Sequence, residues 1–214
     1  MQLHYLVREP QEIKTINPVL ILLHGYGSNE QDLFSFASEL PSDSYVISVR
    51  APYDMMYGSY AWYAINFDAD ENKFSDIGQA RQSRDLLVQC INELVQTYPI
   101  DPKQVTLIGF SQGCILSYSI AVSYPEKVQR VVALSGYFNT DIAVEGFEEK
   151  DLKHLQIFAS HGSVDQVVPV EWARKAAPKL EALGVQVTYK EYPVGHGIAP
   201  QNFFDFRDWL EKTK

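Results

Sequence analysis

The chain has 214 residues, a formal net charge of −9, and 46% hydrophobic and 21% charged residues. That length suits a single α/β domain over residues 1–214 and leaves no room for a second one. The acidic balance argues against nucleic acid as a partner. No apolar run reaches transmembrane length and the start lacks the apolar core of a signal peptide, so we expect a cytoplasmic protein without stable membrane insertion.

Apolar strands alternate with segments of helical period along the chain, which predicts a mostly parallel central sheet with helices on both faces. Asp76 is expected to cap the first long helix. Pro178 lies inside a later helical segment and should kink or split it. In chain order we predict strands at 19–23 and 45–49, a helix at 79–98, a strand at 105–108, a helix at 114–124, a strand at 156–160, a helical segment at 171–183 and a strand at 185–192.

The pattern Gly-x-Ser-x-Gly at residues 109–113 follows a predicted strand directly and precedes a predicted buried helix. A strand that turns this sharply into a helix forces the serine into a strained conformation, and glycine on each side avoids a clash. We therefore predict a nucleophile elbow with Ser111 exposed at its tip. The alternative is a glycine-rich turn whose serine only caps the helix.

A serine nucleophile needs a histidine base and an acid that orients it, in the chain order serine, acid, histidine. Asp165 follows the strand at 156–160, and His196 lies between two glycines after the strand at 185–192. Carboxyl ends of parallel strands share one edge of a sheet, so we expect both residues to reach Ser111. Asp165 could instead be an ordinary turn aspartate that caps the following helix.

An acyl-transfer site also needs backbone amides that bind the negative oxygen of the tetrahedral intermediate. One such amide is expected from Gln112, directly after the nucleophile. The second should come from the loop after an early central strand, and the sequence His-Gly-Tyr-Gly at residues 24–27 fits that place, so we nominate Tyr26. The alternative is a glycine turn with no part in catalysis.

Residues 51–77 form an aromatic-rich loop that we expect to border the active site. We predict that Trp62, Tyr63, Met55 and Met56 line the substrate pocket as an apolar wall. The alternative is a small satellite core beneath a long loop. Seven aromatic residues lie within 22 positions, namely Tyr53, Tyr57, Tyr60, Trp62, Tyr63, Phe67 and Phe74.

His24 and His161 each follow an apolar strand and precede a glycine, so we expect them to hydrogen-bond the loops around the site. No pair of ligands has a zinc-site spacing such as His-Glu-x-x-His, and we predict neither a metal nor a cofactor. Cys90 and Cys114 give no disulfide framework and are expected to be buried small hydrophobic residues.

Five motifs together resemble the phospholipase/carboxylesterase family of α/β-hydrolases, which includes the acyl-protein thioesterases. The resemblance covers nearly the whole chain and implies the α/β-hydrolase fold, a triad of Ser111, Asp165 and His196, and oxyanion amides at Tyr26 and Gln112. The motifs are residues 24–27, 61–63, 109–113, 161–165 with Val168-Pro169, and 192–196.

The sequence departs from the family pattern at three places. Many members carry aspartate where this chain has Ser28 and Ala64, and a second glycine where it has Cys114. The first two positions belong to loops that should border the pocket, so the loss of a carboxylate there changes its polarity. These departures leave the triad intact but put thioesterase activity on acylated proteins in doubt.

We expect a serine carboxylesterase that hydrolyses small to medium carboxylic esters through an acyl-enzyme. Its partner would be a small-molecule ester, and a homodimer is an assembly that the sequence allows. Activity should rise with pH as His196 loses its proton. The alternatives are an acyl-protein or acyl-CoA thioesterase, a lysophospholipase and, more remotely, a non-catalytic binding protein with the same fold.

Overall fold

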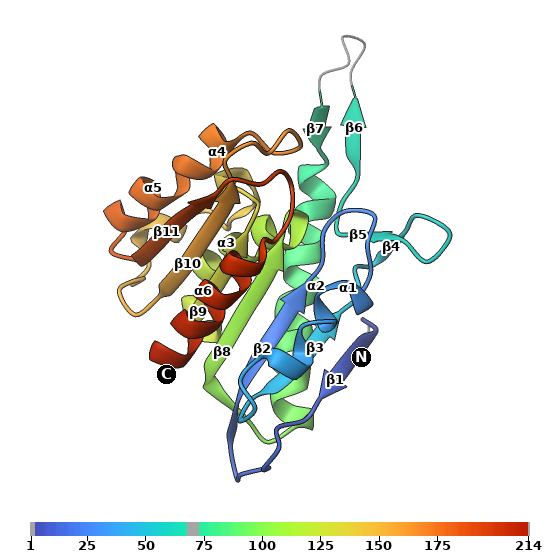
Figure 1. Ribbon diagram of the computed structural model, residues 1–214, viewed down its shortest axis with the longest axis vertical. Helices are drawn as coiled ribbons and strands as arrows, with labels where there is room; N and C mark the ends of the chain where they lie inside the picture. Colours follow the sequence, from blue (N-terminus) through green and yellow to red (C-terminus); the bar gives the residue numbers. More distant parts are fainter. Residues whose placement is uncertain (1–2, 68–72, 214) are drawn as a thin grey trace.

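A seven-stranded sheet runs through the centre of the computed structural model, which describes residues 3–67 and 73–213 (Figure 1). The strand order is β1-β3-β2-β8-β9-β10-β11. β1 pairs with β3 in antiparallel orientation, and the other neighbours pair in parallel. The strands are β1 (Tyr5–Arg8), β2 (Asn17–Leu23), β3 (Tyr45–Val49), β8 (Ile100–Phe110), β9 (Arg130–Leu134), β10 (Gln156–Gly162) and β11 (Gln186–Tyr192).

Helices cover both faces of this sheet, as the sequence predicts. Side chains of α2, α3 and α5 pack in one apolar cluster, and those of α1 and α6 pack in a second one. Figure 1 shows α6 in front of the sheet and α2 behind it. The helices are α1 (Gln31–Phe34), α2 (Ile77–Thr97), α3 (Gln112–Ser123), α4 (Val170–Arg174), α5 (Ala176–Ala182) and α6 (Pro200–Lys212).

The central strands carry apolar residues on both faces because alternate side chains enter different cores. In β2, Ile21 and Leu23 join the cluster of α2 and α3, whereas Leu20 and Leu22 join the cluster of α1 and α6. All four side chains are almost completely buried. The sheet is therefore fixed on both faces, and its strand ends are held firmly in place.

The helix boundaries follow from local chemistry. Asp76 caps α2 by accepting a hydrogen bond of 2.9 Å from the backbone amide of Gln79. The helical segment with Pro178 is split, because α4 ends at Arg174 and α5 begins at Ala176. A proline ring clashes with the carbonyl group four residues earlier, which here belongs to Arg174, so the break falls before the proline rather than at it.

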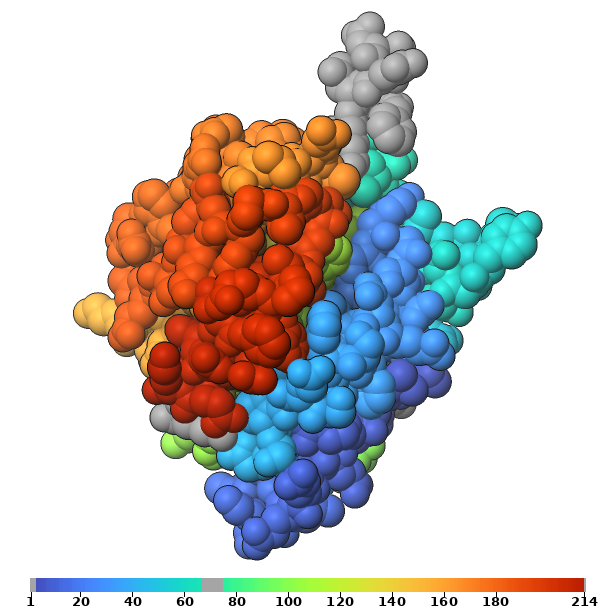
Figure 2. Space-filling view, in the orientation of Figure 1, coloured from blue at the N-terminus to red at the C-terminus, as the bar shows by residue number. Residues whose placement is uncertain are grey.

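Residues 51–77 form two short antiparallel ribbons and the start of α2, with the segment 68–72 outside the described residues. β4 (Tyr53–Asp54) pairs with β5 (Tyr60–Ala61), and β6 (Ile65–Phe67) pairs with β7 (Lys73–Ser75). Figure 2 shows the β4–β5 ribbon in cyan, projecting from one side of the molecule. Among the described helices, none has the length and apolar composition needed to cross a bilayer.

Candidate active site

Ser111 occupies the sharp turn between β8 and α3, with φ 54° and ψ −114°. Non-glycine residues rarely adopt a positive φ, so the surrounding structure must hold this one in place. A Cβ atom on Gly113 would lie 2.0 Å from the carbonyl oxygen of Leu23, and one on Gly109 would lie 2.3 Å from that of Gly113. The two glycines are thus required by close backbone contacts, which explains the motif physically.

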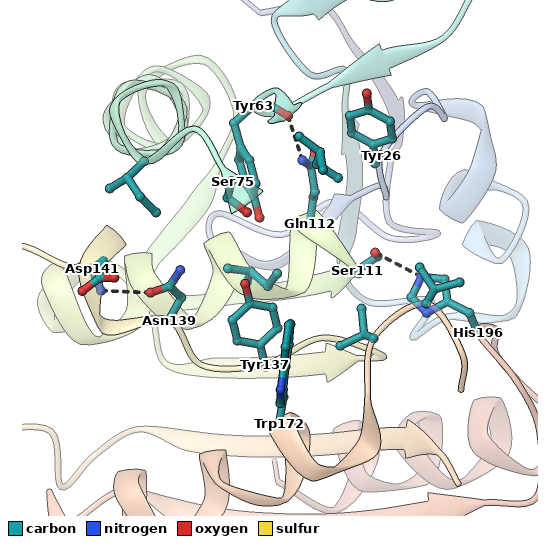
Figure 3. Close-up of a pocket in the computed structure, with 15 residues that line it drawn as sticks. Tyr26, Tyr63, Ser75, Ser111, Gln112, Tyr137, Asn139, Asp141, Trp172 and His196 are labelled. Atoms are coloured by element: carbon teal, nitrogen blue, oxygen red, sulfur yellow. Dashed lines mark hydrogen bonds between the residues drawn. The ribbon is translucent and has the colours of Figure 1, made fainter. Parts of the chain in front are cut away.

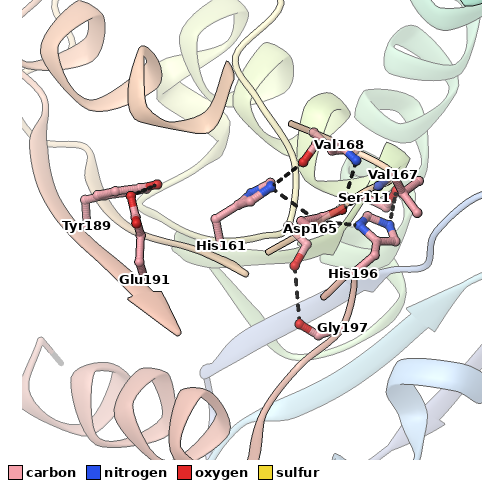
Figure 4. A network of polar contacts seen from close by, with 10 residues as sticks. Ser111, His161, Asp165, Val167, Val168, Tyr189, Glu191, His196 and Gly197 are labelled. Atoms are coloured by element: carbon pink, nitrogen blue, oxygen red, sulfur yellow. Dashed lines mark hydrogen bonds and ion pairs between the residues drawn. The ribbon is translucent and has the colours of Figure 1, made fainter. Parts of the chain in front are cut away.

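The structure brings the three predicted catalytic residues together (Figure 4). Nε2 of His196 lies 3.1 Å from Oγ of Ser111, and Nδ1 lies 2.7 Å from Oδ2 of Asp165. The proton on Nδ1 can be donated to the carboxylate, which leaves Nε2 free to accept the proton of the serine hydroxyl. Asp165 and His196 lie in the loops after β10 and β11, at the carboxyl edge of the sheet where β8 also ends.

The carboxylate of Asp165 is completely buried and well supplied with hydrogen bonds. Backbone amides of Val167 and Val168 donate to its Oδ1 at 2.8 and 2.9 Å. Burial raises its pKa, but the amides of Val168 and Val167 together with His196 lower it by more, so the pKa lies below its ordinary value. Asp165 is therefore a stable anion that can orient the imidazole of His196.

His161 and His24 hydrogen-bond the loops around the site, as predicted. Nε2 of His161 lies 2.8 Å from the carbonyl oxygen of Val168 and 3.2 Å from Oδ2 of Asp165. Nε2 of His24 accepts from the amide of Ala51 at 3.1 Å, and Nδ1 lies 2.7 Å from the carbonyl oxygen of Gly25. Burial lowers the pKa of His24, so it serves these contacts as a neutral ring.

Gln112 connects the elbow to the segment beside it. Its backbone amide opens α3, where helix amides have no intrahelical partner. Its side chain accepts from the amide of Trp62 at 3.0 Å and donates to the carbonyl oxygen of Tyr63 at 2.8 Å. Tyr26, in the loop after β2, lines the same pocket as Ser111 and Gln112. The two predicted oxyanion residues therefore lie at the same pocket as the serine.

A pocket of about 470 Å³ opens beside Ser111 and His196 (Figure 3). Its remaining lining mixes apolar side chains with a few polar ones. The apolar and aromatic members are Tyr26, Tyr63, Ile65, Ile77, Ile115, Tyr137, Val167, Val168 and Trp172. The polar members are Ser75, Gln112, Asn139 and Asp141.

Of the four residues predicted to line the pocket, only Tyr63 does so. Trp62 is fully buried and does not line the pocket, and its indole N–H donates to the carbonyl oxygen of His24 at 2.8 Å. Met55 and Met56 lie on the β4–β5 ribbon, and Met56 is 65% exposed to solvent. The prediction was wrong for these three because composition does not reveal which side of a ribbon or loop faces the pocket.

The side chains of Phe67 and Phe74 from the same aromatic-rich segment are outside those that the structure describes.

Sequence reasoning missed most of the lining residues, among them Tyr137, Asn139 and Trp172. Tyr137 and Asn139 lie in the loop after β9, and Trp172 lies on α4. The rings of Tyr137 and Trp172 meet edge to face, with centroids 5.1 Å apart. The position of Tyr137 after the carboxyl end of a parallel strand was a signal that could have found it, because all such ends meet at the site.

Among the described residues, no group of three histidine, cysteine, aspartate or glutamate side chains is arranged to hold a metal ion. Cys90 and Cys114 are free and buried, as predicted. Burial raises the thiol pKa of Cys90 to about 12 and also raises that of Cys114, which keeps both groups protonated.

A mostly parallel sheet with helices on both faces, and with a strained serine between strand and helix, defines an α/β-hydrolase fold. The family profile described as Phospholipase/Carboxylesterase matches residues 6–214. The chain therefore belongs to the phospholipase/carboxylesterase family, a family of serine hydrolases that act on ester bonds.

Individual relatives agree with this assignment. A probable carboxylesterase SOBER1-like from Arabidopsis thaliana is 31% identical over 53% of this chain and 44% of the relative. Acyl-protein thioesterase 1 from Aspergillus fumigatus is 30% identical over 62% of this chain and 56% of the relative. The chain thus spans about half the length of these two curated relatives. The structure of the Bacillus cereus carboxylesterase has the same fold, with a TM-score of 0.85, 21% identity and coverage of 99% of this chain and 95% of the other.

Proposed function

We propose that the protein is a serine carboxylesterase that hydrolyses small to medium carboxylic esters through an acyl-enzyme on Ser111. The observation that carries the proposal is the hydrogen-bonded series from Oγ of Ser111 through His196 to the buried carboxylate of Asp165. This arrangement supplies a nucleophile, a base and a group that orients the base, which are the parts that acyl transfer to a serine requires.

In the proposed reaction, Nε2 of His196 takes the hydroxyl proton while Oγ of Ser111 attacks the ester carbonyl. The negative oxygen that forms is stabilised by the backbone amides of Tyr26 and Gln112, and one such donor is typically worth about 2.7–4 kcal/mol of barrier. The imidazolium then protonates the departing alcohol. Water, deprotonated by the same imidazole, hydrolyses the acyl-enzyme and releases the acid and the free serine.

The pocket supports a small-molecule substrate. Its volume of about 470 Å³ lies within the range of small-ligand sites. Aliphatic side chains such as Ile65, Ile115 and Val168 line it, so the part of the ester that binds there is largely apolar. The partner in this proposal is a carboxylic ester, and the described residues carry the whole proposed mechanism without a cofactor.

A thioesterase is the second candidate, and the relative named acyl-protein thioesterase 1 favours it. The same residues would cleave a thioester by the same steps, with a thiol in place of the alcohol. Matched oxygen and sulfur esters of one acyl group separate the two candidates, because the preferred ester is the one with the higher kcat/KM. A lysophospholipase would show its preference on lysophospholipids in the same comparison.

The first test is hydrolysis of p-nitrophenyl esters from acetyl to palmitoyl by the wild type and by Ser111→Ala. We expect the variant to lose roughly 10⁴-fold or more in kcat, because the nucleophile is absent. Ser35→Ala is the matched control, since Ser35 is exposed on the surface. Undiminished turnover in Ser111→Ala would refute the proposal. A folded wild type that cleaves no ester would point to a dedicated thioesterase or to a binding protein.

A further inference from the structure

The pocket beside Ser111 has two chemically different ends. Figure 3 shows Ser111 and His196 at one side of the pocket, and Asn139 and Asp141 at the opposite side. The rings of Tyr137 and Trp172 lie between them. A group that enters beside the serine and fills the pocket therefore meets polar side chains at its far end.

The polar end of the pocket carries groups that can donate and accept hydrogen bonds. Ser75, Asn139 and Asp141 line it together with Tyr63 and Tyr137. Oδ1 of Asn139 accepts from the backbone amide of Asp141 at 3.0 Å, which orients the side chain of Asn139. Its amide N–H groups can donate, and the hydroxyls of Ser75 and Tyr137 can both donate and accept, so this end offers both kinds of partner.

We propose that this pocket binds an acyl group that is apolar next to the ester and carries a hydroxyl group at its far end. The inference rests on the proposed function, because it names the substrate class of the same site. The hydroxyl would exchange hydrogen bonds with Tyr137 and Asn139, as both donor and acceptor. The aliphatic part would pack against side chains such as Ile115 and Val168.

A plain alkyl chain of the same length fits this end less well. Its terminal methyl group would displace water from the hydroxyl of Tyr137 and from Asn139 without replacing the hydrogen bonds that the water makes, and this weakens binding.

A terminal carboxylate is also disfavoured, because Asp141 lines the pocket and no lysine or arginine does so among the described residues. The nearby Arg81 donates to the backbone carbonyl oxygen of Asp141 at 2.9 Å, outside the lining.

The test compares three series of p-nitrophenyl esters with equal numbers of heavy atoms, ending in methyl, hydroxyl or carboxylate. We expect similar kcat/KM for short chains and, once the chain reaches the polar end, a preference of roughly tenfold for the hydroxyl over the methyl series. The carboxylate series should be the poorest. Equal or better cleavage of the methyl series at every length, or a preference for the carboxylate, would overturn the inference.

The variant Tyr137→Phe tests the same inference by changing the protein instead of the substrate. This variant removes the hydroxyl but keeps the ring that packs against Trp172, so the selectivity ratio should fall toward one. Tyr57→Phe is the matched control, because Tyr57 is 98% exposed on the β4–β5 ribbon and should keep the wild-type ratio. A Tyr137→Phe ratio equal to that of the wild type would contradict the assignment. Turnover that depends on Ser111 but shows no selectivity would refute this inference alone and leave the proposed esterase intact.

Discussion

At the scale of single residues, Asp165 and His196 have different electrostatic roles in the proposed mechanism. Hydrogen bonds from Val167, Val168 and His196 keep the pKa of Asp165 below its usual range despite its burial. The carboxylate is therefore already charged at every pH at which a histidine ordinarily titrates. A loss of activity on mild acidification would therefore not come from protonation of Asp165.

We accordingly expect kcat/KM to rise with pH from about 5 to about 8. The reason is that a protonated His196 cannot accept the hydroxyl proton of Ser111. The measurement is a pH profile on an acetyl ester, with the circular dichroism of the protein recorded at each pH to confirm that it stays folded. A flat profile over this range would count against His196 as the base.

The three proposed catalytic residues could be found from sequence because each belongs to a short local pattern. Gly-x-Ser-x-Gly surrounds Ser111, and glycines flank His196 at the end of a strand. The pocket depends instead on contacts across the sheet, such as that of Tyr137 with Trp172, which lie 35 positions apart. No local pattern predicts such a pair, and Met55 and Met56 were wrongly assigned to the pocket for the same reason.

At the scale of elements, the elbow depends on the close approach of α3 to β2. A Cβ atom on Gly113 would lie 2.0 Å from the carbonyl oxygen of Leu23 and 2.6 Å from its carbonyl carbon, both of which belong to the backbone of a buried strand. Backbone in the centre of a sheet cannot move aside as a flexible side chain can. This contact fixes the first turn of α3, and with it the amide of Gln112.

We expect Gly113→Ala to destabilise the protein by about 3 kcal/mol or more, because the added methyl group forces strand and helix apart. Gly195→Ala is the matched control, since a Cβ atom there would meet nothing within 4 Å. Chemical denaturation of both variants gives the comparison. Equal free energies of unfolding would show that the elbow tolerates a side chain at position 113.

Hydrophobic pattern predicted β2, β3 and α2, because these elements bury their apolar residues in continuous cores, but it did not identify β1, β9 or α6. The split between α4 and α5 also followed from one residue, Pro178. The pattern failed at residues 51–77, where the strands are only two or three residues long. Strands this short show no detectable alternation of apolar and polar residues. The two ribbons of this segment were therefore not predicted from its aromatic composition.

At the scale of the whole molecule, carboxylates link stability to pH. Arg50 donates two hydrogen bonds to the buried Glu30, at 2.6 and 2.5 Å, and lowers its pKa. Lys190 and Tyr192 hold the pKa of Asp205 at about 2. In the folded protein, the pKa of each carboxyl group therefore lies below its value in the unfolded chain, which is near 4. These carboxylates therefore stabilise the fold above about pH 4, and that contribution disappears as the pH falls through the folded-state values.

Thermal unfolding should show a Tm that is steady near neutral pH and falls as the pH is lowered from about 5 toward 2. Glu30→Gln should lower stability at neutral pH by about 2 kcal/mol, because Arg50 loses a charged acceptor, and should flatten the dependence on pH. Glu148→Gln serves as the control, since Glu148 is exposed. Parallel curves for Glu30→Gln and the wild type would contradict a role of Glu30 in acid stability.

The β6–β7 ribbon contributes residues to the pocket but none of the proposed catalytic residues. Ile65 and Ser75 face each other across this ribbon and both line the pocket, and the described residues of the ribbon form a two-stranded sheet separate from the seven-stranded one. A slip of one residue in a ribbon turns every side chain to the opposite face. In evolutionary terms, one inserted or deleted codon in this segment could exchange the substrates that the enzyme accepts and leave Ser111 and its partners untouched.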